Sequence, residues 1–340
     1  MEPLPGTAQR SDERFAWRFR ERAGGDGPIS FASFMDLALF DPEVGYYAVQ
    51  RARVGKAAGT DFYTATTFAG VFAPLVLAAI EHLLTGQGLG ATADHAFVEI
   101  GAEPERALLD GVAHPFAATQ TLRLGSPLVL PRRAVVFSNE LFDAQPFHRL
   151  IWREGRWREA GVRLSGGELG WEDLPNISPE LDAVRTHLPA EADEGYVLDV
   201  PWRAARLLAS IAALPWTGLF VACDYGRTWR QIAEDFPQGT GRGYLAHKQA
   251  GDLLASPGEQ DLTCHVCWDW LEAALRDAGF RTVQRESQES FFMNRATAAI
   301  EAIMRSDPNP WSPARSQLKQ LLHPGFMGQR FEVLWGVRTP

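Results

Sequence analysis

Short apolar runs alternate along this chain with longer segments in which apolar residues recur at helical spacing. The runs that predict buried strands are residues 96–100, 134–138, 195–200, 218–223, 280–286 and 331–337. The segments that predict helices are residues 30–39, 68–84, 202–213 and 268–278. Strands that alternate with helices predict an α/β fold, with a mostly parallel sheet and helices on both of its faces.

Three further segments set the expected organisation. Residues 13–22 (ERFAWRFRER) predict an N-terminal helix, and the polar residues 1–12 before it read as a frayed tail. Residues 147–158 alternate apolar and charged side chains around Gly155, which predicts a β-hairpin. We therefore expect a tail and helix over residues 1–28 and one domain over residues 29–340. A small inserted subdomain is expected near residues 150–195.

Composition and charge narrow the class of protein. The chain has 340 residues, 46% of them hydrophobic, and a net charge of −9. Such a charge argues against a general nucleic-acid binder, which needs a basic face. The three cysteines are too few for a disulfide framework, which favours a reducing cytoplasm. No apolar run approaches the roughly 20 residues of a membrane span, so no membrane is expected.

Acidic side chains follow three of the predicted strands. Glu99 stands near the end of the first strand, just before Gly101, where a cofactor would meet the backbone. Glu140 and Asp143 follow the second strand, and Asp224 follows the third. Ligands of parallel sheets bind at the carboxyl ends of the strands. The sequence therefore predicts a functional pocket at this edge.

Glu140 and Asp143 are three residues apart, so that one turn could direct both into the pocket. Two carboxylates suit the bidentate binding of a guanidinium or ammonium group. They could also serve as an acid/base pair. The same spacing is explained by acids that cap the start of a helix.

Cysteine and histidine residues offer a weaker alternative. Cys264 and Cys267 form a lone CxxC, and zinc would need further ligands, for which Cys223 and His247 are the complement. A metal-dependent hydrolase built on Cys264, Cys267 and His265 is the hypothesis that follows. His265 itself is equally well explained as a structural or a catalytic residue. No GxSxG motif supports serine hydrolysis.

An ordered set of motifs resembles the MidA type of S-adenosylmethionine-dependent methyltransferase, which includes the mitochondrial complex I assembly methyltransferases. The matching segments run in family order from residue 30 onward. They are residues 30–47 (SFASFMDLALFDPEVGYY), 61–64 (DFYT), 98–101 (VEIG), 138–146 (SNELFDAQP), 223–226 (CDYG), 239–247 (GTGRGYLAH), 261–266 (DLTCHV) and 327–334 (MGQRFEVL).

The resemblance implies a Rossmann-like methyltransferase core, S-adenosyl-L-methionine as cofactor and a protein side chain, such as arginine, as substrate. Glu140 and Asp143 would then orient a guanidinium, with His265 as a third catalytic candidate. The implied cofactor-binding residues are Asp61, Thr64, Glu99, Gly101, Asn139 and Asp224. No metal is implied.

Two departures from the family pattern argue against ordinary binding of the cofactor. The family turn reads roughly E-x-G-x-G-x-G, and here its later glycines are replaced by Glu103 and Glu105. A side chain at either position would crowd the cofactor. Residues 102–134 are also short and hold only one predicted helix, residues 103–111, and one strand-like piece, residues 119–124. We therefore expect the second core strand to be lost, together with the acid that holds the cofactor's ribose. The alternative function is therefore a non-enzymatic protein-binding or assembly factor on the same fold.

Overall fold

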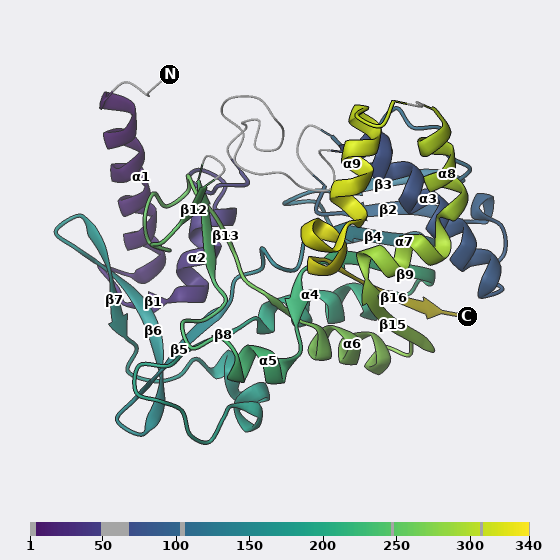
Figure 1. The fold of residues 1–340 in the computed structure, drawn as a ribbon. Helices are drawn as coiled ribbons and strands as arrows, with labels where there is room; N and C mark the ends of the chain where they lie inside the picture. Colours follow the sequence, from purple (N-terminus) through teal and green to yellow (C-terminus); the bar gives the residue numbers. More distant parts are fainter. Residues whose placement is uncertain (1–4, 49–67, 103–105, 246–247, 307–308, 340) are drawn as a thin grey trace.

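The computed structural model describes residues 5–48, 68–102, 106–245, 248–306 and 309–339, with the side chains of the first helix described from residue 13. Two β-sheets and their surrounding helices make up most of this part of the chain. Figure 1 shows the two sheets side by side, with the N-terminal helix beside the smaller one and the C-terminus at the larger one.

The larger sheet has six strands in the order β15-β16-β9-β4-β2-β3. Strands β3, β2, β4 and β9 run parallel, whereas β16 is antiparallel to β9 and β15 is antiparallel to β16. Their bounds are β2 Ala96–Ile100, β3 Ala118–Leu122, β4 Arg133–Asn139, β9 Thr217–Asp224, β15 Thr282–Ser287 and β16 Glu332–Arg338. The α/β class is therefore confirmed.

Strand β3 confirms the strand-like piece predicted at residues 119–124 and corrects the expectation that the second core strand is lost. It pairs in parallel with β2 from Ala96–Ala118 to Ile100–Leu122. A parallel crossover needs only a dozen or so residues, and the connection between the two strands supplies them. The predicted helix over residues 103–111 is also wrong where the structure describes it, because residues 106–111 form a turn. No acid follows β3, whose next residues are Arg123, Leu124 and Gly125.

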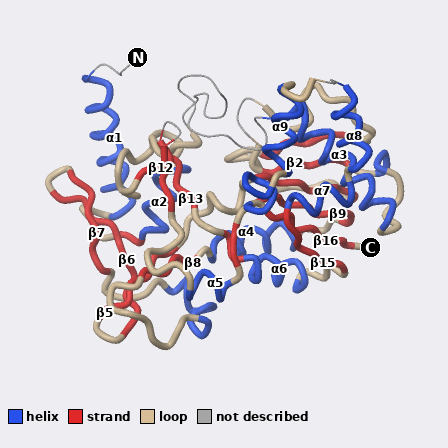
Figure 2. The backbone as a smooth tube through the Cα atoms, in the orientation of Figure 1, coloured by secondary structure: helices blue, strands red, loops and turns tan. Residues whose placement is uncertain are grey.

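Helices cover both faces of the large sheet because successive strand residues point to opposite sides. In β4, Val135 and Phe137 pack with α3, α7 and α9, whereas Val136 packs with α4 and α6. Figure 2 shows helices on both sides of these strands. The helix bounds are α3 Ala69–Gly86, α4 Trp202–Ala213, α6 Trp268–Asp277, α7 Gln288–Arg295, α8 Thr297–Ser306 and α9 Pro313–Leu322.

Helix α3 is the one helix in the described ranges that is long and apolar enough to cross a membrane, judged by length and composition. Its 18-residue apolar window is 56% buried inside the protein. Phe72, Leu75 and Ile80 belong to the core beneath the large sheet. A core helix passes the same test, so α3 gives only weak evidence of a membrane span.

The smaller sheet is antiparallel, with the order β1-β6-β5-β8 and with β7 paired to β6. The predicted hairpin is confirmed as β5 and β6, which meet at the turn of Glu154 and Gly155. Strand β1 comes from the N-terminal part of the chain and pairs with β6. The bounds are β1 Ile29–Ser30, β5 His148–Arg153, β6 Arg156–Ser165, β7 Glu168–Asp173 and β8 Val197–Val200.

Two helices pack against this sheet through aromatic side chains. Helix α1 (Pro5–Ala23) and helix α2 (Phe31–Phe40) share a core that contains Phe15, Phe19 and Phe34. Helix α1 begins at Pro5, so the tail expected over residues 1–12 is wrong from that residue on. Proline is tolerated in the first turn of a helix because the N–H groups there have no intrahelical partner.

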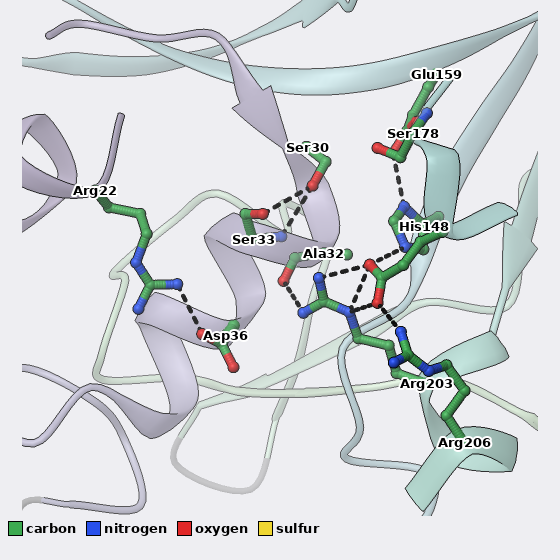
Figure 3. A network of polar contacts seen from close by, with 11 residues as sticks. Arg22, Ser30, Ala32, Ser33, Asp36, His148, Glu159, Ser178, Arg203 and Arg206 are labelled. Carbon is green, nitrogen blue, oxygen red and sulfur yellow. Dashed lines mark hydrogen bonds and ion pairs between the residues drawn. The ribbon is translucent and has the colours of Figure 1, made fainter. Parts of the chain in front are cut away.

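An ionic network that extends from the buried His148 to the surface connects the smaller sheet to helix α4 (Figure 3). His148 makes hydrogen bonds with Glu159 at 2.7 Å through Nδ1 and with Glu180 at 3.1 Å through Nε2. Arg203 and Arg206 of α4 donate to Glu180 at 2.8 Å and 2.7 Å. These hydrogen bonds raise the pKa of His148 against the lowering effect of burial, and they hold the pKa of Glu180 at about 2.

The chain between β9 and α6 links the two sheets through short elements. These are β10 Gly226–Arg227, α5 Trp229–Glu234, β11 Arg242–Leu245, β12 Lys248–Ala250, β13 Asp261–Thr263 and β14 Val266–Cys267. Strand β11 pairs with β12 and β13, and β10 pairs with β14. The remaining helical turns are Thr92–Asp94, Pro179–His187 and Pro324–Gly328.

Candidate functional site

The carboxyl ends of β2, β4 and β9 lie at one edge of the large sheet. Glu99 is in register with Phe137, and Asn139 is in register with Cys223. The pairing therefore gathers the candidates Glu99, Gly101, Asn139, Glu140, Asp143 and Asp224 at this edge. Asp61, Thr64, Glu103, Glu105 and His247 lie outside the described residues, so the predictions that rest on them are not addressed by the structure.

The end of β2 keeps one required glycine. Gly101 has a φ of 81°, and a Cβ there would lie 2.7 Å from Cδ1 of Leu141. Its N–H donates to the carbonyl oxygen of Leu122 at 2.9 Å. Glycine suits this backbone angle, and a Cβ would have to displace the end of the Leu141 side chain. The buried Glu99 accepts the N–H of Leu108 at 2.7 Å through Oε2 and so anchors the segment that follows the turn.

The end of β4 holds a non-glycine residue in the left-handed region. Glu140 has a φ of 51°, and its N–H donates to the carbonyl oxygen of Cys223 at 2.9 Å. Asn139 donates from Nδ2 to Oε1 of Glu140 at 2.9 Å, while Oδ1 of Asn139 is buried without a hydrogen-bond partner in the part of the chain described. Such backbone conformations cost about 1 kcal/mol or more and concentrate at functional sites.

Asp143 and Asp224 are buried carboxyl groups. Asp224 accepts the N–H of Phe142 at 2.9 Å and that of Tyr225 at 2.9 Å. Burial, together with the charge of Glu140, raises the pKa of Asp224 to about 7. Burial, and then the charges of Asp224 and Asp261, raise the pKa of Asp143 well above its usual range. Oδ1 of Asp143 has no hydrogen-bond partner among the described residues.

The capping interpretation of Glu140 and Asp143 is wrong. Residues 140–147 form bends and turns, and no helix begins there. The loop is held instead by Asp224, whose carboxylate binds the N–H of Phe142. Because these acids do not cap a helix, the binding of a cation and acid/base chemistry remain as their predicted roles.

The segment of His265 is attached to this acidic cluster. The N–H of Cys264 donates to the carbonyl oxygen of Asp143 at 2.9 Å, and the rings of His265 and Tyr225 are 5.9 Å apart. Burial and then the charges of Arg227 and Arg242 lower the pKa of His265 to about 4. A neutral imidazole with so low a pKa is a poor general base near neutral pH. Its catalytic role stays a prediction.

Four polar residues that are not among the candidate site residues contribute two further hydrogen bonds near the site. Tyr47 donates to Asp261 at 2.8 Å, and Tyr225 donates to Thr263 at 2.7 Å. All of them fall in the quoted family motifs, which were the available signal. Their contacts could not be found by spacing, because Tyr47 and Asp261 are 214 residues apart.

The cysteines do not converge on a metal. Cys264 packs in the core of α1 and α2, whereas Cys267 packs in a different core with Leu150 and Leu198. Burial raises the pKa of both thiols. Within the described ranges no group of three His, Cys, Asp or Glu residues could hold a metal ion. The hydrolase hypothesis therefore gains no support.

The glycines of residues 239–243 allow this loop to pack closely against Asp199. Asp199 accepts the N–H groups of Thr240 and Gly241 at 2.7 Å each through Oδ2, and its other oxygen binds Arg149 at 2.8 Å. A Cβ on Gly239 would lie 2.4 Å from Oδ2 of Asp199. The predicted loop continues into β11 at Arg242.

Comparison with known proteins finds methyltransferases among the sequences that resemble this chain. Residues 117–285 match a family model described as "Putative S-adenosyl-L-methionine-dependent methyltransferase". The mitochondrial protein arginine methyltransferase NDUFAF7 of Danio rerio is 25% identical, over 92% of this chain and 84% of the relative. The human protein of the same name is 24% identical, over 90% of this chain and 79% of the relative.

A solved structure resembles nearly the whole chain. A Burkholderia thailandensis protein bound to S-adenosyl-homocysteine matches with a TM-score of 0.85 and 26% identity, over 99% of this chain and 95% of that one. A second structure of a protein from that organism matches with a TM-score of 0.80 and 25% identity. Over nearly its whole length the chain is thus similar to S-adenosylmethionine-dependent methyltransferases, as the resemblance to the MidA type predicts.

Proposed function

We propose that this protein binds S-adenosylmethionine on a Rossmann-like core and transfers its methyl group to an arginine side chain of a protein. Strand β3 restores the core strand that the sequence suggested was lost. The arginine methyltransferases of fish and human extend along 90% or more of the chain, and the similar bacterial protein holds S-adenosyl-homocysteine.

The residues at the ends of β2 and β4 fit the cofactor. Gly101 keeps the backbone angle that the family turn requires, and the unpartnered Oδ1 of Asn139 can accept a hydrogen bond from a ligand. Glu99 anchors the segment after the turn and so sets its position. When bound, the cofactor supplies an electrophilic methyl group on a sulfonium.

The observation that carries the proposal is the pair of buried acids Asp143 and Asp224. Neither forms an ion pair with a Lys or Arg side chain in the described ranges, and both have a raised pKa. A buried carboxylate without a cation is unfavourable, and an arriving guanidinium removes that cost. Glu140 and Asp143 would orient the guanidinium. One of the carboxylates at this edge of the sheet would accept the proton that the guanidinium loses on methylation.

Transfer of labelled methyl groups from S-adenosylmethionine to proteins of a cell lysate tests the proposal. We expect Glu140→Gln to reduce labelling about 100-fold or more, because it removes a charge that orients the substrate. Glu234→Gln, at a side chain that is 58% exposed, is the control and should label normally. An unchanged signal in Glu140→Gln would contradict the role given to Glu140.

One observation favours the rival function, a non-enzymatic assembly factor. No acid follows β3, where the family places the group that holds the ribose. That function predicts no labelled protein with any variant, although a partner would still be bound. A cytoplasmic location, a protein partner, and the absence of nucleic-acid and membrane binding remain predictions.

A further inference from the structure

Two arginines pair with residues on either side of His265 through neighbouring strands. Arg242 of β11 is in register with Thr263, two residues before His265. Arg227 of β10 is in register with Cys267, two residues after it. The charges of both arginines act on His265 and lower its pKa. Strand pairing thus brings two guanidinium groups from distant loops to one short segment.

Neither arginine has a carboxylate partner in the described part of the chain. Arg242 donates from Nη1 to the carbonyl oxygens of Gly239 and Gly241, and Arg227 donates from Nη1 to the carbonyl oxygen of Gly226. Their Nη2 atoms make no hydrogen bond to a described residue. Arg149, by contrast, is bound twice by Asp199. Half-buried guanidiniums held by backbone carbonyls keep free donors for an anion.

The arginines share a surface with the acidic cluster. Arg242 and Tyr244 are opposite Thr263 and Asp261, so all four side chains project from one face of β11 and β13. The hydroxyl of Tyr225 donates to Thr263 on this face, and Tyr225 directly follows Asp224. Arg242 therefore projects from the same strand face as Asp261, whose charge acts on Asp143.

Such a surface has charges of both signs. Carboxylates at the ends of β4 and β9 suit a cationic side chain, and the adjacent guanidiniums suit an anionic one. His265 lies between the strand partners of the two arginines, and its buried Nδ1 has no hydrogen-bond partner among the described residues. A neutral imidazole there can accept or donate a hydrogen bond without repelling an anion or the arginines.

We propose that Arg227 and Arg242 bind a carboxylate of the substrate protein close to its target arginine, so that the enzyme selects acidic sequence contexts. The inference rests on the proposed function only in naming the target as arginine. The carboxylate site itself requires no methyl transfer, which allows the two ideas to be tested apart.

Binding of synthetic peptides tests the carboxylate site. Fluorescein-labelled peptides with one central Arg carry a single Glu or a single Gln at each nearby position, in an otherwise uncharged sequence. Affinities are measured by fluorescence anisotropy with S-adenosyl-homocysteine present. We expect the best Glu peptide to bind about tenfold more tightly than its Gln counterpart, the usual effect of one charge-assisted hydrogen-bonded contact.

The variants separate this site from general charge attraction. In R227Q/R242Q the ratio of Glu to Gln affinity should fall close to one, whereas R230Q, at an arginine 83% exposed on α5, should keep it. R242K retains the charge without the planar fork and should keep part of the ratio. Thermal unfolding of each variant verifies that it is folded. An unchanged ratio in R227Q/R242Q, or equal binding of Glu and Gln peptides by the unaltered protein, would overturn the inference.

The same peptides distinguish the two proposals. A Glu preference that depends on Arg227 and Arg242, without methyl transfer to any peptide, would support the carboxylate site and contradict the arginine methyltransferase. Methyl transfer that is equal for Glu and Gln peptides, with equal binding, would support the enzyme and overturn the carboxylate site.

Discussion

Replacing Asp224 with asparagine should change the stability of the protein in a way that depends on pH. Burial raises the pKa of Asp224 to about 7 in the folded state, whereas an unfolded aspartate has a pKa near 4. As the pH rises between these values, the unfolded side chain loses its proton while the folded one keeps it. Asp224 therefore destabilises the folded state progressively over this range.

The size of this effect follows from the two pKa values. Asp224 destabilises the folded protein by about 2 kcal/mol at pH 5 and by about 4 kcal/mol at pH 8. Asparagine removes this cost, but it has only one acceptor oxygen for the N–H groups of Phe142 and Tyr225. The loss of one of these two hydrogen bonds destabilises the variant by about 1–3 kcal/mol at either pH. The free energy of unfolding of Asp224→Asn relative to the unaltered protein should therefore rise by about 2–3 kcal/mol between these pH values.

Urea unfolding followed by tryptophan fluorescence at the two pH values measures this change. Asp277→Asn, at the exposed last residue of α6, is the matched control and should show no such rise. Equal effects of Asp224→Asn at both pH values would refute the reasoning, because they would mean that the folded carboxyl group titrates like an unfolded one.

Further variants test other parts of the account. Gly101→Ala should cost up to about 1 kcal/mol more than Gly111→Ala in urea unfolding, because both glycines have a positive φ but only the Cβ at Gly101 meets a neighbour, the flexible end of Leu141. His148→Gln should cost more at pH 6 than at pH 9, since the raised pKa of His148 gives stability that is present below its unfolded pKa and lost as pH rises through the folded one. Elemental analysis of the purified protein should find no stoichiometric zinc, and bound zinc would revive the role of Cys264.

Much of the large sheet could be predicted because its central strands are buried on both faces. Strands β2 and β4 are continuous apolar runs for that reason. The sequence predicts strand β3 only as a strand-like piece, because it lies at the edge of the sheet, where exposed and half-buried positions carry Ala118, Thr119, Gln120 and Thr121. Its polar sequence therefore gives a weak signal for a core strand.

The site could be predicted as far as topology decides it. Acids that follow parallel strands must meet at one edge, and Glu140, Asp143 and Asp224 do so. The left-handed backbone of Glu140 and the bond between Tyr47 and Asp261 have no local sequence signal, because tertiary contacts impose them. The pairing of Arg242 with Thr263 likewise depends on strand register.

The central claim is that this chain binds S-adenosylmethionine at the ends of β2 and β4. Calorimetric titration of the folded protein with S-adenosyl-homocysteine tests it most directly, with Gly101→Ala as the comparison. We predict micromolar binding at one site per chain, weakened in Gly101→Ala and retained in Gly111→Ala. A folded, unaltered protein that gives no binding heat and no thermal stabilisation by the ligand would contradict the claim and favour the assembly factor.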